Sequence, residues 1–181
     1  IIRSRLRHVD RQRMVQAGTY NFITVNGPSL YHFLPAGMDK EMLYTMFSGM
    51  ALALGMAMLA AVCLLLCLRR EQITQESVVL ACLLVLGGVP FFLPKMHERY
   101  TFGADVLSLV AAAYCPKRVV LPLLFCLASY ICYTAGLPGD AIMELKWATL
   151  CQGAAVALTA AALWKSLHED KENACLTEVK A

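Results

Sequence analysis

Residues 42–68 read MLYTMFSGMALALGMAMLAAVCLLLCL and contain no charged residue, and the run ends at Arg69-Arg70-Glu71. A helix needs about 20 apolar residues to cross a hydrocarbon core of roughly 30 Å, so this stretch is long enough to span a membrane. Its Gly49 and Gly55, together with its alanines, are small residues that let a neighbouring helix approach closely. The stretch therefore predicts a membrane-spanning helix.

The rest of the chain has the same character. Of its 181 residues, 59% are hydrophobic and 16% are charged, whereas soluble domains carry about 25% charged residues. The apolar residues come in blocks separated by short charged segments, which is typical of membrane spans. The sequence therefore predicts an all-α, polytopic helical membrane protein with about five transmembrane helices. The spans are expected at about 42–68, 78–94, 102–115, 119–136 and 147–164.

Composition also limits the partners and cofactors. The net charge of +3 is too small to indicate nucleic acid binding, so the expected surroundings are membrane lipid. All of the eight cysteines except Cys175 lie inside or at the ends of apolar blocks, and none forms a C-x-x-C pair. Buried thiols of this kind usually act as small hydrophobic residues. The sequence predicts no metal site and no cofactor.

The basic residues indicate an orientation. With the predicted spans, Arg69-Arg70, Lys117-Arg118 and the segment after Lys165 fall on one side of the membrane, and residues 95–101 and 137–146 fall on the other. Cytoplasmic loops carry an excess of Lys and Arg, so the first side is expected to be cytoplasmic. The loop that carries His97–Arg99 is then predicted to be exoplasmic.

The N-terminal segment fits this order less simply, because it carries several arginines between Arg3 and Arg13 on the side predicted to be exoplasmic. It is either an exoplasmic segment that follows an absent span, or residues 14–38 re-enter or cross the membrane. We favour the exoplasmic loop because the stretch is rich in Asn, Pro and hydroxyl side chains. The predicted organisation is 1–41 exoplasmic or interfacial segment, 42–165 transmembrane helical bundle and 166–181 cytoplasmic polar tail.

Ionisable residues cluster after the second predicted span. Lys95, His97, Glu98 and Arg99 lie within PKMHERY, and Asp105 follows inside an apolar run. Ionisable groups at membrane depth are costly, so they are usually paired or line a polar cavity. If the third helix begins near His97, Glu98 and Asp105 share one face. The cations would then bind an anionic headgroup, with Arg as a fork for phosphate oxygens and Lys as a point charge.

Simpler roles remain open for the same residues. Charged residues at a span end often only anchor the helix at the membrane interface. Asp105 either caps the third helix, pairs with Arg99, or contacts a substrate.

The cluster lies in a motif with a family resemblance. Residues 91–112, FFLPKMHERYTFGADVLSLVAA, resemble the M-H-E-R-Y signature near the C-terminus of bacterial integral-membrane glycosyltransferases of the GT-C class, which are mannosyltransferase-like. Residues 19–37, TYNFITVNGPSLYHFLPAG, are similar to an exoplasmic segment of that family that reads S-x-N-A-x-N-L-W. Asn26 and Leu30-Tyr31 match this segment, whereas Gly27 and Ser29 depart from it.

The resemblance implies a membrane enzyme that transfers a sugar from a polyprenyl-phosphate-linked donor to an exoplasmic glycan, lipid or protein acceptor. It implies a bacterial cytoplasmic membrane, with His97–Arg99 exoplasmic. In the family the catalytic base is typically an Asp in the first exoplasmic loop. No such loop is present here, so the chain is expected to be the C-terminal part of a longer enzyme.

The resemblance also suggests roles for individual residues. Lys95, His97 and Arg99 would bind the lipid phosphate, and Glu98 and Asp105 would orient these cations or contact sugar hydroxyls. The residues expected to line the donor or acceptor pocket are Asn26, Tyr31 and His32. A simple turn at Asn26-Gly27-Pro28 is an equally good interpretation of that segment.

Two other classes of function remain as alternatives. A transporter or lipid flippase is compatible with an intramembrane Asp105 and with helices broken at Pro90 and Pro94. A noncatalytic membrane subunit would use every charge as an anchor. Neither alternative is excluded by the sequence.

Overall fold

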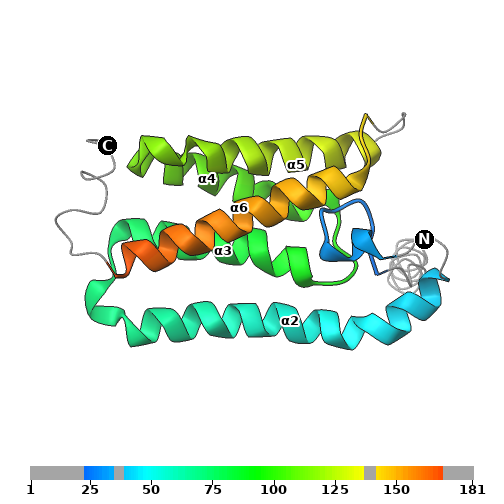
Figure 1. Ribbon diagram of the computed structural model, residues 1–181, viewed down its shortest axis with the longest axis horizontal. Coiled ribbons are helices and arrows are strands. Elements are labelled where there is room, and N and C mark those ends of the chain that lie inside the picture. The colour runs from blue at the N-terminus through cyan, green and yellow to red at the C-terminus, as the bar shows by residue number, and fades with distance from the viewer. Residues whose placement is uncertain (1–22, 35–38, 137–141, 169–181) are drawn as a thin grey trace, which may run out of the picture.

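The computed structural model describes residues 23–34, 39–136 and 142–168, and within these ranges it is helical, with no strand. Five α-helices pack side by side with their axes roughly parallel to the long axis of the molecule (Figure 1). They are α2 (Lys40–Leu68), α3 (Gln75–Phe92), α4 (Phe102–Tyr114), α5 (Val120–Gly136) and α6 (Leu145–Ser166). A short 3₁₀ helix, η1 (Leu30–Phe33), precedes α2, and three more lie between the α-helices: η2 (Arg70–Gln72), η3 (Glu98–Thr101) and η4 (Pro116–Val119). The predicted all-α class is confirmed.

Four of the helical stretches are long and apolar enough to cross a membrane. They are Glu41–Leu68, Gln75–Phe92, Pro116–Gly136 and Leu145–Ser166, with mean hydropathies between 1.3 and 2.7. The predicted span at 102–115 differs, because the corresponding helix α4 has 13 residues. A helix rises about 1.5 Å per residue, so its length is roughly 20 Å. This helix is too short to cross the hydrocarbon core by itself.

Helix α3 lies at the centre of the bundle, where it contacts α2, α4 and α6. It begins at a capping box, in which the Thr74 side chain accepts from the Ser77 N–H and the Ser77 side chain accepts from the Thr74 N–H. The helix continues through Pro90 to Phe92, so the predicted break at Pro90 is not observed. A Cβ on Gly87 would lie 2.6 Å from the Phe125 ring. Because Gly87 has no Cβ, this ring of α5 can approach α3 closely.

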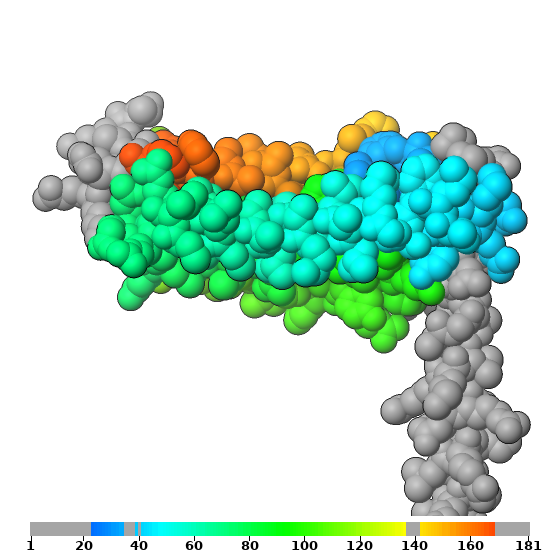
Figure 2. All heavy atoms as spheres, turned by 90° about the horizontal axis from the view of Figure 1, so that it is seen from below, coloured from blue at the N-terminus to red at the C-terminus, as the bar shows by residue number. Residues whose placement is uncertain are grey.

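The apolar core lies between α3, α5 and α6. Leu80 and Leu83 of α3 are fully buried against Phe125 of α5 and Leu163 of α6. Helix α2 behaves differently, because it lies along one face of the bundle over its full length (Figure 2), and only 17% of its most apolar window is buried. An apolar helix with so much exposed surface is what a lipid-facing position requires.

The loops gather at two ends of the bundle. One end, which we call the basic end, carries Arg69, Arg70, Lys117, Arg118 and Lys165. The other, which we call the loop end, carries residues 23–34 and the loop from Leu93 to Thr101 (Figure 1). This grouping agrees with the predicted order of the loops along the chain. Which side of the membrane each end faces stays a prediction.

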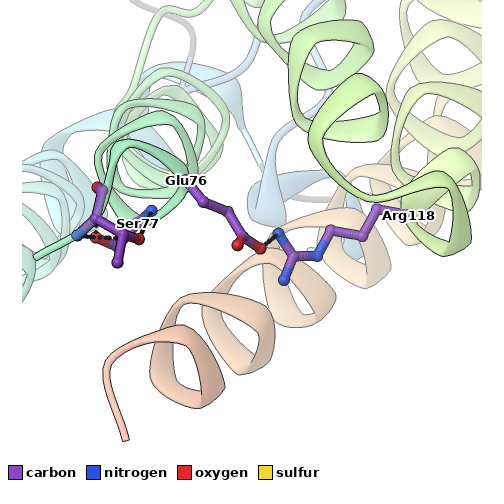
Figure 3. Close-up of polar contacts among 4 residues, drawn as sticks. Glu76, Ser77 and Arg118 are labelled. Atoms are coloured by element: carbon purple, nitrogen blue, oxygen red, sulfur yellow. Dashed lines mark hydrogen bonds and ion pairs between the residues drawn. The ribbon is translucent and has the colours of Figure 1, made fainter. Parts of the chain in front are cut away.

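At the basic end one ion pair is largely buried. The Glu76 carboxylate of α3 contacts the Arg118 guanidinium of η4 (Figure 3), and their side chains are 15% and 10% exposed. The pair ties the start of α3 to the start of α5. By contrast, the ion pair between Arg70 and Glu71 is 80% and 84% exposed.

Candidate functional site

The candidate site is at the loop end, where residues 23–27 lie against the loop from Leu93 to His97. Two backbone hydrogen bonds join these segments, which are about 70 positions apart in the chain: the Lys95 N–H donates to the Ile23 carbonyl (3.0 Å) and the Gly27 N–H donates to the Met96 carbonyl (3.1 Å). The close approach depends on Gly27. A Cβ at this position would lie 2.7 Å from the Met96 carbonyl oxygen, so residues with side chains do not fit here.

Side chains fix the same segment to the helices. The Tyr31 hydroxyl donates to the Phe92 carbonyl at the end of α3 (2.9 Å), and the Thr149 hydroxyl of α6 donates to the Ser29 carbonyl (3.2 Å). Ile23 and Tyr31 pack in a small apolar cluster with residues of α2. The segment that was expected to form an exoplasmic loop is therefore, over residues 23–34, a structured cover on the end of the bundle.

His32 folds back on this cover. Its Nε2–H donates to the Gly27 carbonyl (2.9 Å). Burial lowers the pKa of His32 below its ordinary value, and the hydrogen bond to Gly27 opposes this effect. His32 is therefore held in its neutral form, as a brace within the segment rather than as a cation for a phosphate. Burial raises the pKa of Tyr31, so its hydroxyl stays protonated as a donor.

Lys95 has an unusual backbone conformation. Its φ is +59°, in the left-handed region that non-glycine residues seldom adopt. A residue held there costs of order 1 kcal/mol or more, and the hydrogen bond from its N–H to Ile23 offsets this cost. Its Nζ lies 4.4 Å from the centre of the Tyr44 ring of α2, at cation–π distance. The ammonium is thus positioned at the edge of the site.

Glu98 is the most buried ionisable residue of the motif. Its side chain is 17% exposed, and its Oε2 is buried without a hydrogen-bond partner among the described residues. The nearest basic side chain is that of His97, whose Nδ1 lies 3.9 Å from Oε2, beyond hydrogen-bond distance. Asn26 Nδ2 and Glu98 Oε2 both lie within 3.5 Å of the point that a Cβ on Gly136 would occupy. The amide and the carboxylate therefore both lie next to the last residue of α5, which has no side chain.

Asp105 lies deeper along the same side of the bundle. Its Oδ1 accepts a hydrogen bond from the Ser129 hydroxyl of α5 (2.9 Å), and Ser129 is also bonded to Thr101 (3.0 Å). Glu98 and Asp105 thus both face α5, at positions two helical turns apart. The alternative in which Asp105 pairs with Arg99 is not observed, since Arg99 is exposed at the surface of the loop end. The third helix begins as η3 at Glu98 and becomes α-helical at Phe102.

Several residues of the site were not predicted from the sequence. Gly27 and Gly136 provide the space for Asn26 and Glu98, and Tyr44 and Ser129 supply contacts to Lys95 and Asp105. Of these residues, the sequence pointed only to Gly27, as part of a possible turn at Asn26-Gly27-Pro28. Within residues 23–34, 39–136 and 142–168, no group of three or more His, Cys, Asp or Glu side chains is arranged to hold a metal ion.

Comparison with protein-family models, curated proteins and solved structures finds no match to this chain. The resemblance of the M-H-E-R-Y motif to GT-C enzymes therefore stays a prediction.

Proposed function

We propose that this chain forms part of a membrane glycosyltransferase that transfers a sugar from a polyprenyl-phosphate donor to an exoplasmic acceptor. The observation that carries the proposal is the contact between residues 23–27 and the Leu93–His97 loop. The resemblance assigns both Asn26 and the M-H-E-R-Y motif to the site, and the segments that carry them are joined by backbone hydrogen bonds. A contact between segments this far apart in the chain is what a shared binding site requires.

Burial supports a binding role over simple anchoring. Charged side chains that only anchor a helix extend toward water, but the Glu98 carboxylate is turned toward Asn26 and Gly136 and has an unused acceptor atom. An unsatisfied buried acceptor is costly unless a ligand or water supplies a donor. A sugar hydroxyl supplies such a donor. The left-handed Lys95 adds to this argument, because strained backbone is often found at functional sites.

The basic residues of the motif are suited to bind the phosphate of the donor. Lys95, His97 and Arg99 surround Glu98 in sequence and lie half-buried or exposed at the loop end. In the proposed reaction an acceptor hydroxyl attacks the anomeric carbon, and the bond from that carbon to the phosphate oxygen breaks. Polyprenyl phosphate leaves as an anion, and the hydroxyl proton goes to a base that is not assigned here. Fixed cations stabilise the negative charge that develops on the leaving phosphate.

The experiment measures transfer of radiolabelled mannose from polyprenyl-phosphate mannose in membranes that contain the protein. Replacing one charge-stabilising group at such a site typically lowers kcat by about a hundredfold or more, which is the expectation for Arg99→Ala. Glu98→Gln removes the carboxylate charge but keeps the shape, and should lower transfer by about tenfold to a hundredfold. Arg70→Gln is the matched control, since it removes one exposed cation from the basic end. Transfer at the wild-type rate in both loop-end variants, with normal membrane insertion, would overturn the proposal.

Gly136→Ala tests the geometry without changing any charge. The added methyl would lie 3.2 Å from Asn26 Nδ2 and 3.4 Å from the Glu98 carboxyl carbon, so the two side chains must move apart. Transfer is expected to fall while membrane insertion is unchanged. A helix broken at Pro90 was one observation in favour of a transporter, and α3 is continuous through Pro90.

A further inference from the structure

A groove opens between α5 and α6 at the basic end, far from the candidate site. It has a volume of about 380 Å³ and is lined by Lys117, Arg118, Val120, Leu121, Leu158, Ala162 and Lys165. Ligand sites in proteins have volumes of about 300 Å³ and above. The groove is therefore large enough for a small polar group together with part of an alkyl chain.

The lining of the groove has a basic part and an apolar part, which follow one another along the long axis of the bundle. Leu158, Ala162 and Lys165 follow one face of α6 at helical spacing, and Lys117 precedes the first residues of α5. The two lysines are thus at the outer rim, at the ends of their elements, and the apolar walls extend inward from them. Ala162 is the small residue that leaves room between the two helices.

The third basic residue of the lining, Arg118, is buried. Arg118 is turned inward and its charge is balanced by Glu76 (Figure 3). Lys117 and Lys165 are exposed, and no carboxylate among the described residues forms an ion pair with Lys117. The rim therefore carries two exposed lysines beside an apolar groove, in which Val120 and Leu158 are also exposed.

We propose that this groove binds an anionic phospholipid of the membrane leaflet at the basic end. The phosphate would lie between Lys117 and Lys165, and an acyl chain would lie along Val120, Leu158 and Ala162. A phospholipid has its anionic phosphate directly beside its acyl chains, which is the arrangement that the groove complements. Basic pockets between transmembrane helices bind anionic headgroups in this way. This inference does not depend on the proposed sugar transfer.

The test is native mass spectrometry of the whole chain with added phosphatidylglycerol, phosphatidylcholine or glycerol 3-phosphate. Lys117→Gln with Lys165→Gln should weaken phosphatidylglycerol binding by about 30-fold, which corresponds to about 2 kcal/mol. Arg69→Gln with Arg70→Gln removes the same charge from the same end outside the groove and should leave binding nearly unchanged. Ala162→Phe fills the groove without a change in charge and should abolish phosphatidylglycerol binding.

Each contrary outcome overturns the proposal. An equal loss in the arginine pair would mean that only the overall surface charge attracts the lipid. Equal binding of phosphatidylcholine would remove the role of the lysines, and wild-type binding by Ala162→Phe would remove the role of the groove. Glycerol 3-phosphate that binds as tightly as phosphatidylglycerol would point to a soluble phosphate instead of a lipid.

Discussion

Gly27→Ala is the sharpest test of how the candidate site is assembled. The new methyl would lie 2.7 Å from the Met96 carbonyl oxygen, 3.0 Å from the Met96 carbonyl carbon and 3.1 Å from the His97 carbonyl carbon. All of these are backbone atoms, so no side chain can rotate to make room. Residues 23–27 must therefore move away from the Leu93–His97 loop, and Asn26 moves with them.

The size of the effect follows from the bonds that are lost. Separation of the two segments breaks the hydrogen bonds from Gly27 to Met96 and from Lys95 to Ile23. A backbone hydrogen bond contributes about 1 kcal/mol net, so docking of the segment should weaken by about 2 kcal/mol. At about 1.4 kcal/mol for each factor of ten, this is a change of about 30-fold in the docking equilibrium.

Hydrogen exchange of the purified protein in detergent measures that equilibrium directly. The amides of residue 27 and Lys95 should exchange about 30-fold faster in the variant, if docking limits their protection. Gly49→Ala is the matched control, because a Cβ at Gly49 has no atom within 4 Å. Sugar transfer should fall in Gly27→Ala alone. Unchanged protection of both amides would refute the docked geometry, whatever happens to activity.

Three further outcomes are expected. Glu76→Gln should lower the free energy of unfolding by about 3 kcal/mol because it leaves Arg118 buried and unpaired. Glu71→Gln should lower it by less than about 1 kcal/mol, since its ion pair is exposed. Thermal unfolding of both variants in detergent measures the difference. Burial lowers the pKa of His32, so His32 is protonated more readily when the segment is undocked. The protection of residues 23–34 from hydrogen exchange should therefore weaken as the pH falls below about 6.5. This pH dependence should be lost in His32→Asn. Gly87→Ala should cost about 1–3 kcal/mol, since its Cβ would lie 2.6 Å from a fully buried phenylalanine ring of α5, and chemical denaturation would show a loss below this range if the core adapts.

The helices were predictable because lipid imposes a simple requirement on sequence. A span must be long and apolar and must satisfy its own backbone, so its hydropathy indicates its position. The predicted run at 42–68 and the observed α2 differ at their start by two residues. Helix α4 was harder, since its apolar run is short, and a sequence alone does not show that its first turn begins as a 3₁₀ helix within the loop end.

The site was predictable only in part, for a physical reason. PKMHERY marks its cluster by charge density, which is visible in a sequence. The contact of Asn26 with that cluster depends on backbone hydrogen bonds between distant segments, which leave no periodic signal. The Ser129 partner of Asp105 is a single hydroxyl inside an apolar helix, and such a residue is equally common as a core residue bonded to its own backbone. The sequence did not indicate the ion pair between Glu76 and Arg118, since the two residues lie in different helices, α3 and η4.

The two ends of the bundle treat their charges differently, and this difference bears on the noncatalytic alternative. At the basic end the buried carboxylate of Glu76 is neutralised by Arg118, whereas Arg70, Lys117 and Lys165 are exposed. Charges that only orient the protein in the membrane and contact lipid are usually paired or exposed in this way. At the loop end Glu98 has cations as its sequence neighbours, yet its Oε2 is buried with no hydrogen-bond partner among the described residues. A chain that needed these charges only as anchors would gain stability by pairing Glu98 or by exposing it. The burial of Oε2 without a hydrogen-bond partner among the described residues therefore favours a binding role over anchoring.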